Sequence, residues 1–252
     1  MLEGRHDNVK RILAIGDIHG CYPAFDALLE AVNPGPDDLV ITLGDYIDRG
    51  PDAKKVIDRL LRLQENSLVV PLSGNHEEMI LDWRDKNYEK TLLWWANGGL
   101  ATLRSYCRGD ARWLIRMFWK SYIPNQAYGY HDRACELIPP AHWEFFENCR
   151  DRFETGGWIF VHGQVDPHLT LAEQSTLQLH WARFSISQKP HISGKKVICG
   201  HTPQADGIPT DIGHTVCIDT YLYGGQWLTC MDVRNNRYFQ ANTLGETRII
   251  EK

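Results

Sequence analysis

The sequence predicts an α/β fold in which short, buried strands alternate with helices. Five runs of aliphatic and β-branched residues have the length of strands, and their apolar character is continuous instead of alternating. Continuous runs are typical of strands that other layers cover on both faces. Helical patterns separate the first three runs, and this strand–helix–strand order is the signature of an α/β layer fold. The five predicted strands are residues 11–15, 39–43, 68–72, 158–161 and 196–199.

Two helices are expected between the first three strands. In residues 22–31, Phe25, Leu28 and Leu29 fall on one helical face. Residues 51–64 begin with Pro51, and proline is well tolerated at the first helical position, where a backbone N–H has no partner to lose. The same segment carries apolar residues at helical spacing, so each helix presents one apolar face to the sheet.

A mostly helical segment, rich in Trp, Tyr and Arg, is expected from about residue 77 to 154. No linker rich in Gly, Ser or Pro separates it from the strands. We therefore expect a single domain over residues 1–252, with this segment as a helical cap. A turn at residues 235–237 joins the last two predicted strands in a hairpin. The late strands are predicted at residues 215–219, 226–233 and 238–241.

Charge and composition exclude several classes of protein. The chain has 27 Lys and Arg against 32 Asp and Glu, a formal charge of −5. A protein that mainly holds nucleic acid or an anionic membrane needs a positive surface, so we expect neither as a stable partner. The sequence has no apolar run of membrane-spanning length and no signal-peptide pattern. Seven scattered cysteines without a CxxC pair favour a reduced, cytoplasmic protein.

Polar side chains follow all five of the first predicted strands, in each case beside a glycine. Loops at the carboxyl ends of strands build the sites of open α/β sheets, and glycine lets the chain turn sharply beside a ligand. The motifs are GDIHG at 16–20, GDYIDRG at 44–50, GNHE at 74–77, HG at 162–163 and GHT at 200–202. They supply six candidate metal ligands: Asp17, His19, Asp45, Asn75, His162 and His201.

This mixed set of oxygen and imidazole donors suits Mn, Fe or Zn in a catalytic site better than a structural zinc site, which favours cysteines. Six ligands are too many for one tetrahedral ion but suit two ions that share a bridging carboxylate. Two such ions, about 3.5–4 Å apart, activate a water for in-line attack on phosphorus. Each motif alone could be a strand-end turn or the start of a helix; the five together indicate a site.

GDIHG, GDYIDRG and GNHE, about thirty residues apart, resemble the three-part signature of the calcineurin-like metallophosphoesterases. The DRG within the second motif resembles the corresponding motif of the phosphoprotein phosphatase branch of this family. That branch includes serine/threonine phosphatases and symmetrical diadenosine tetraphosphate hydrolases. Residues 95–99 (WANGG), 181–183 (WAR) and 199–203 (CGHTP) resemble segments of small bacterial phosphatases, so the resemblance covers nearly the whole chain. It implies two facing β-sheets flanked by helices, and it favours a bacterial or phage source.

The resemblance also implies a role for each site residue. Asp45 would bridge two divalent ions, with manganese expected and iron or zinc as alternatives. His76 would protonate the leaving oxygen, and Asp48 would orient its ring. The phosphoryl group would be bound by Arg49, Asn75 and Arg183, although Arg183 could equally be a surface arginine. The first ion would be held by Asp17, His19 and Asp45, and the second by Asp45, Asn75, His162 and His201.

The expected function is metal-dependent hydrolysis of phosphoserine or phosphothreonine in proteins, with phosphotyrosine as a further option. The alternative is cleavage of diadenosine tetraphosphate or a related nucleotide, because the same metal site serves both reactions. The WANGG and WAR segments favour the protein phosphatase. A catalytically silent metal-binding protein is disfavoured because every catalytic residue is present. A nuclease is disfavoured by the acidic charge and by the Asp48–Arg49 pair, which suits a terminal phosphoryl group.

Gln164 follows His162–Gly163 where relatives more usually have Ala and Gly, so a different loop shape is expected near the substrate. Three further features have two interpretations. The side chains of Tyr221 and Tyr223 either line the substrate groove or pack. The thiols of Cys21 and Cys199 are either sensitive to oxidation or buried as small apolar groups. Four cap arginines at helical spacing form a docking strip or a solvated stripe. These are Arg104, Arg108, Arg112 and Arg116.

Overall fold

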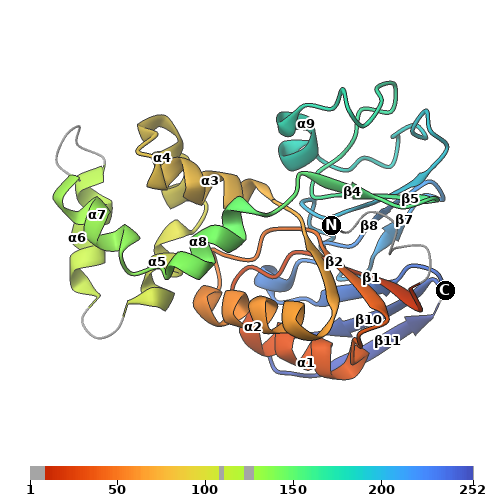
Figure 1. Cartoon of the computed structure of the whole chain (residues 1–252), viewed down its shortest axis with the longest axis horizontal. Helices are drawn as coiled ribbons and strands as arrows, with labels where there is room; N and C mark the ends of the chain where they lie inside the picture. The colour runs from red at the N-terminus through yellow and green to blue at the C-terminus, as the bar shows by residue number, and fades with distance from the viewer. Residues whose placement is uncertain (1–8, 108–110, 122–127, 252) are drawn as a thin grey trace.

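Two mixed β-sheets pack face to face, with helices on their outer faces, in the computed structural model (Figure 1). The structure describes residues 9–107, 111–121 and 128–251. Between the sheets, Ile12, Leu39 and Ile41 of the first sheet share one apolar core with Phe160 and Ile198 of the second. The predicted α/β class and the two facing sheets are therefore confirmed.

The first sheet has six strands in the order β11-β10-β9-β1-β2-β3. Strands β1, β2 and β3 run parallel, and β9, β10 and β11 form an antiparallel meander beside β1. The predicted hairpin near the end of the chain is the β9–β10 pair. Strand bounds are β1 Arg11–Ile15, β2 Asp38–Thr42, β3 Leu68–Pro71, β9 Leu228–Asp232, β10 Arg237–Ala241 and β11 Thr247–Glu251.

The second sheet has five strands in the order β4-β5-β6-β8-β7, with β5, β6 and β8 parallel. The predicted strands 158–161 and 196–199 are β5 and β6, and the predicted strand 215–219 ends at Cys217 as β8. Three strands were not expected: β4, β7 and β11. Strands β4 and β7 are short, and the residues of β11 alternate between exposed and partly buried positions. The bounds are β4 Arg152–Glu154, β5 Trp158–Val161, β6 Lys196–Cys199, β7 Thr210–Asp211 and β8 Thr215–Cys217.

Three helices cover the outer faces of the sheets. Helices α1 (Tyr22–Val32) and α2 (Ala53–Asn66) pack on the first sheet, and α9 (Thr176–Trp181) packs on the second through Leu179 (Figure 1). Pro51 does not open α2 as expected, because the turn before the helix places Asp52 at the N-cap and the Asp52 carbonyl accepts the N–H of Val56.

The segment between β3 and β4 is helical, as predicted. The last three residues of the predicted range, 77–154, form strand β4 instead. In Figure 1, α4, α6 and α7 lie to the left of the sheets, whereas α3 and α8 lie beside them. That this helical segment belongs to a single domain with the sheets stays a prediction. The helices are α3 Asn75–Arg84, α4 Tyr88–Ala96, α5 Gly99–Tyr106, α6 Arg112–Ser121, α7 Tyr128–Cys135 and α8 Pro140–Glu147.

The expected stripe of cap arginines on one helical face is wrong. Helix α5 ends at Tyr106 and α6 begins at Arg112, so Arg104 lies on a different helix from Arg112 and Arg116. Arg108 lies outside the described residues. In the described parts of the chain, no helix has the length and apolar character to cross a membrane.

Candidate active site

The strand-end motifs meet at one pocket of about 490 Å³. Asp17 and His19 follow β1, Asp45 follows β2, and Asn75 begins α3 directly after β3. From the second sheet, His201 follows β6 and reaches the same pocket. His162, after β5, lies fully buried behind it. All of the predicted phosphate-binding residues line the pocket as well: Arg49, Asn75 and Arg183.

The backbone around the pocket is held in conformations that most residues avoid. Six site residues that are not glycine have a positive φ, in the left-handed region. Such conformations cost on the order of 1–3 kcal/mol each, and they persist only where the surrounding structure fixes them. Their clustering at one pocket therefore supports a functional site. The residues are His19 (46°), Asp45 (53°), Asp48 (68°), Arg49 (66°), His201 (61°) and Tyr221 (60°).

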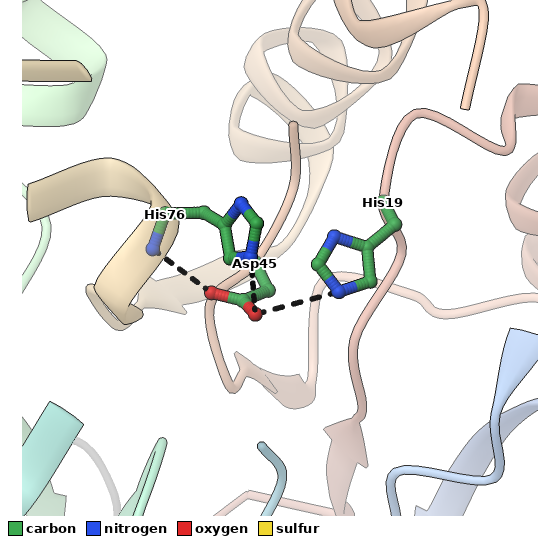
Figure 2. Close-up of side chains that lie close together, drawn as sticks. All are labelled: His19, Asp45 and His76. Atoms are coloured by element: carbon green, nitrogen blue, oxygen red, sulfur yellow. Dashed lines mark hydrogen bonds and ion pairs between the residues drawn. The ribbon is translucent and has the colours of Figure 1, made fainter. Parts of the chain in front are cut away.

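Asp45 lies at the centre of the candidate ligands. Its Oδ2 is 3.4 Å from His19 Nε2 and 3.7 Å from His76 Nε2, as Figure 2 shows. Its Oδ1 is 3.3 Å from His162 Nε2. Burial raises the pKa of Asp45, but His162, His76 and the other surrounding histidines lower it further, so the carboxyl is ionised. One carboxylate thus belongs to two groups of possible metal ligands: His19–Asp45–His76 and Asp45–His162–His201.

Two histidines turn an unprotonated nitrogen towards Asp45. His19 Nδ1 donates to the Ile47 carbonyl at 3.0 Å, and His162 Nδ1 donates to the Leu43 carbonyl at 2.8 Å. A carbonyl only accepts, so both protons reside on Nδ1 and both Nε2 lone pairs face the pocket. Burial lowers the pKa of His162 to about 3 and that of His19 well below its usual value. Neutral imidazoles in a fixed tautomer are the form that binds metal ions.

A second group of acceptor atoms converges beside Asp45. Asn75 Oδ1 lies 3.1 Å from His162 Nε2 and 3.0 Å from His201 Nδ1, and these two nitrogens are 3.1 Å apart. A further hydrogen bond joins the His201 ring to the backbone of Trp181. Oxygen and nitrogen lone pairs pointing at one small region fit a divalent cation, which would satisfy all of them.

Asp17 occupies the pocket wall but is not part of either three-residue group. Its carboxylate accepts the backbone N–H of His201 at 3.1 Å and is hydrogen-bonded to the side chain of Asp219. Gly200 packs directly on this carboxylate, where a Cβ would collide with it. Burial, Asp219 and Asp45 raise the pKa of Asp17 well above its usual range. Two buried carboxyls in contact require a proton or a cation between them.

His76 and Asp48 form a fully buried pair. Their Nδ1 and Oδ2 atoms are 2.6 Å apart, the distance of a charge-assisted hydrogen bond. Burial lowers the pKa of His76, but Asp45 and Asp48 raise it more, so its net pKa lies above the usual value. Its Nε2 lies 3.3 Å from an Nη of Arg49, whose guanidinium stacks on the Tyr223 ring at 3.9 Å. Arg49 therefore lies between the imidazole and the pocket.

The side chains of Tyr221 and Tyr223 reach the pocket, whereas Gln164 does not. Both tyrosines line the pocket, together with Trp181. Gln164 does not line it; its amide donates to the Cys199 sulfur at 2.8 Å, inside the second sheet. The departure from the usual residues after His162 therefore does not reach the substrate side.

A model of the calcineurin-like phosphoesterase family matches residues 10–205, which is most of the chain. The chain belongs to this family. It is thus a hydrolase of phosphoester bonds, and membership implies divalent metal ions. The donors around Asp45 fit that requirement.

Relatives of this phosphoesterase differ in their substrates. It is 29% identical over 226 residues to serine/threonine-protein phosphatase 1 of Salmonella typhimurium, covering 87% of this chain and 90% of the relative. It is 28% identical over 232 residues to an asymmetrical bis(5'-nucleosyl)-tetraphosphatase of Geobacillus thermodenitrificans, covering 86% and 88%. A cold-active protein-tyrosine phosphatase of a Shewanella species shares the fold, with a TM-score of 0.61, 16% identity and coverage of 96% and 81%.

Glu77, for which the sequence predicted no role, supports the loop of the phosphoesterase that carries Asp45. The carboxyl accepts the backbone N–H groups of Asp45 at 2.8 Å, Tyr46 at 2.9 Å and Gly74 at 3.0 Å. These bonds link the second and third motifs and fix Asp45 in its left-handed conformation. The sequence feature that could have predicted this role is the position of Glu77 directly after His76, at the start of α3.

The thiols of the phosphoesterase serve packing. Cys21 and Cys199 are buried, and burial raises the pKa of Cys21 to about 11 and that of Cys199 well above its usual value. Because the thiolate is the reactive form, neither sulfur is activated for oxidation.

Two ion pairs of the buried His180 ring join α9 to part-exposed carboxylates of the helical segment and of the turn after it. His180 Nδ1 lies 3.3 Å from Glu78 and Nε2 lies 3.2 Å from Asp151. Burial lowers the pKa of His180, but the two carboxylates raise it more, to about 9. Trp181 donates to the same Glu78 at 2.9 Å, so this network also holds the segment leading to Arg183.

The phosphoesterase is expected to lose stability between pH 6.5 and pH 9. A raised folded-state pKa stabilises the protein below the unfolded value of 6.5, and this contribution disappears as pH rises through about 9. The shift corresponds to about 3 kcal/mol. Urea unfolding at pH 6 and pH 9.5 measures the difference, and His180→Gln should remove most of it. An equal pH dependence in parent and variant would contradict the role of His180.

Proposed function

We propose that this phosphoesterase hydrolyses phosphoserine and phosphothreonine in proteins. The observation that carries the proposal is the position of Arg49, which lines the same pocket as Asp45 and lies 3.3 Å from His76 of the buried His76–Asp48 pair. A terminal phosphoryl group entering the pocket would meet both the ligand set and an acid for its leaving oxygen. The near full-length likeness to a bacterial serine/threonine phosphatase supports this substrate class.

The residues would hold two ions that share Asp45, with manganese proposed and iron or zinc as alternatives. When bound, the ions would supply a hydroxide nucleophile and neutralise charge on the phosphoryl group. The chemistry of the donors supports this division, because each set combines carboxylate or amide oxygen with imidazole. The sets are Asp17, His19 and Asp45 for one ion, and Asp45, Asn75, His162 and His201 for the other.

Arg49 and Arg183 would bind the phosphoryl oxygens, because a planar guanidinium matches two oxygens at once. Asn75 adds an amide at the same wall of the pocket. His76 would donate its Nε2 proton to the leaving oxygen, while Asp48 keeps the Nδ1 proton in place. This requires Arg49, which stacks on the Tyr223 ring, to turn from His76 towards the phosphoryl group.

Nucleotide hydrolysis is the second candidate. Trp181, Tyr221 and Tyr223 line the pocket, and aromatic side chains provide surfaces on which a nucleobase stacks. A symmetrical diadenosine tetraphosphate hydrolase or a related nucleotide hydrolase would use the same metal ligands. The likeness to an asymmetrical tetraphosphatase over 86% of the chain supports this candidate.

The manganese-loaded protein is expected to release phosphate from a phosphothreonine peptide much faster than it cleaves diadenosine tetraphosphate. Both substrates are assayed side by side, with His76→Asn as the control for contaminating phosphatase. Rapid cleavage of the dinucleotide with little release from the peptide would overturn the proposal. It would make the aromatic side chains contacts for the bases.

A further inference from the structure

Helices α4 and α5 supply two of the three side chains that bind the Asp48 carboxylate. The indole Nε1–H of Trp94, on α4, lies 2.9 Å from Oδ2 and 3.1 Å from Oδ1. The hydroxyl of Thr102, on α5, donates to Oδ1, and His76 occupies Oδ2. All four side chains are fully buried. Both oxygens are therefore paired, and the plane of the carboxylate is fixed from outside the strand-end motifs.

Thr102 also fixes the backbone of Asp48. Its hydroxyl oxygen accepts the Asp48 N–H at 2.8 Å while the hydroxyl proton goes to the carboxylate of the same residue. Asp48 has a φ of 68°, so its backbone needs outside support to stay in that conformation. One hydroxyl thus satisfies a buried N–H and orients a buried carboxylate, two tasks that valine could not perform.

The segment between α4 and α5 touches the next residue of the motif as well. Gly98 has a φ of 102°, and a Cβ there would lie 2.7 Å from the Arg49 nitrogen and 3.2 Å from its Cα. Asn97 lines the pocket itself. The helical segment is therefore in contact with Asp48 and Arg49 in turn, and it is more than a cover over the pocket.

We infer that Trp94 and Thr102 are positioning residues for proton transfer to the leaving group. By fixing Asp48, they aim the Nε2 atom of His76, so that the helical segment helps to set the rate of the chemical step. The inference rests on the proposed role of His76 as the acid. Neither residue touches the pocket, so neither is a contact for substrate.

Trp94→Phe and Thr102→Val test the inference, because each removes a hydrogen bond to Asp48 and keeps a similar shape. The manganese-loaded variants are assayed on a phosphoserine peptide and on p-nitrophenyl phosphate. On the peptide, kcat should fall on the order of 10-fold to 100-fold, with KM within a few-fold of the parent. On p-nitrophenyl phosphate the fall should be within a few-fold, because nitrophenolate leaves without a proton. Thr102→Ser should restore the rate on the peptide.

Matched controls come from the same helices. Trp95 stacks on Trp94 with ring centroids 4.9 Å apart, and its Nε1 has no hydrogen-bond partner among the described residues. Thr91 is buried, and among the described residues its hydroxyl donates to the carbonyl of Asn87, the N-cap of α4, at 2.9 Å. Trp95→Phe and Thr91→Val should therefore keep the parental ratio of rates on the two substrates.

A readout without turnover is the proton NMR spectrum of the metal-free protein. The short His76–Asp48 bond should give a low-field Nδ1–H resonance that moves upfield or vanishes in Thr102→Val. Equal losses on both substrates, or an unmoved resonance, would overturn the inference. If His76→Asn itself harms both substrates equally, the proposed acid is wrong. If that variant discriminates between the substrates and the Trp94 and Thr102 variants do not, only the inference fails.

Discussion

Asp45→Asn is expected to lower metal-dependent phosphate release on the order of 10³-fold while the protein stays folded. Asp45 is the one carboxylate shared by both groups of possible ligands, and its net negative charge is stabilised by the histidines around it. An amide oxygen would bind an ion more weakly and could not bridge two. Each ion supplies several kcal/mol of charge stabilisation in such reactions. Losing that stabilisation accounts for a fall in rate on the order of 10³-fold.

The measurement combines steady-state phosphate release with metal content after dialysis. Asp58→Asn is the matched control, because the Asp58 carboxylate binds Lys54 and His142 away from the pocket. The control should retain activity and metal. If Asp45→Asn keeps two ions per chain and turns over within a few-fold of the parent, the bridging role is wrong.

His76→Asn is expected to reduce kcat on a phosphoserine peptide on the order of 10²-fold to 10⁴-fold, the range of general acid catalysis. The alkoxide of serine is a poor leaving group, so it depends on a proton delivered as the bond breaks. The fully buried pairing with Asp48, which favours the charged imidazole, equips His76 for that step. Asp48→Asn should act in the same direction, because it removes the carboxylate that orients the ring.

Turnover and metal content are measured together in these variants, since His76 also lies beside His19 and Asp45. A loss of bound metal in His76→Asn would assign this residue to the ligands instead. His214→Asn serves as the control, because that ring bonds the Gln188 carbonyl outside the pocket and has no other hydrogen-bond partner among the described residues. Unchanged kcat in His76→Asn would exclude the acid role.

The strand-end residues were predictable because their signal is local. Asp17, Asp45 and His162 each follow a continuous apolar run, and parallel strands bring such positions to one edge of a sheet. The general rule required no knowledge of distant contacts. It also applies to Asp219, which follows β8, although no role was predicted for it.

The support of these residues was not predictable, because it comes from far along the chain. Trp94 and Thr102 are 46 and 54 residues from the Asp48 that they bind. Nothing in the spacing of a helical segment says which of its buried polar atoms faces a motif. The arginine stripe failed for a related reason: the pattern continued at helical spacing across residues where the helix had already ended at Tyr106.

The candidate ligands come from both sheets, with Asp45 and Asn75 on one side and His162 and His201 on the other. The site therefore lies at the boundary between the two sheets. Its geometry depends on the distance and angle between two sheets that are each hydrogen-bonded separately. Phe160 packs in the core between them, so its side chain helps to set the distance between the two sets of candidate ligands. A substitution there would mimic an active-site lesion in a genetic screen without altering a single reacting group.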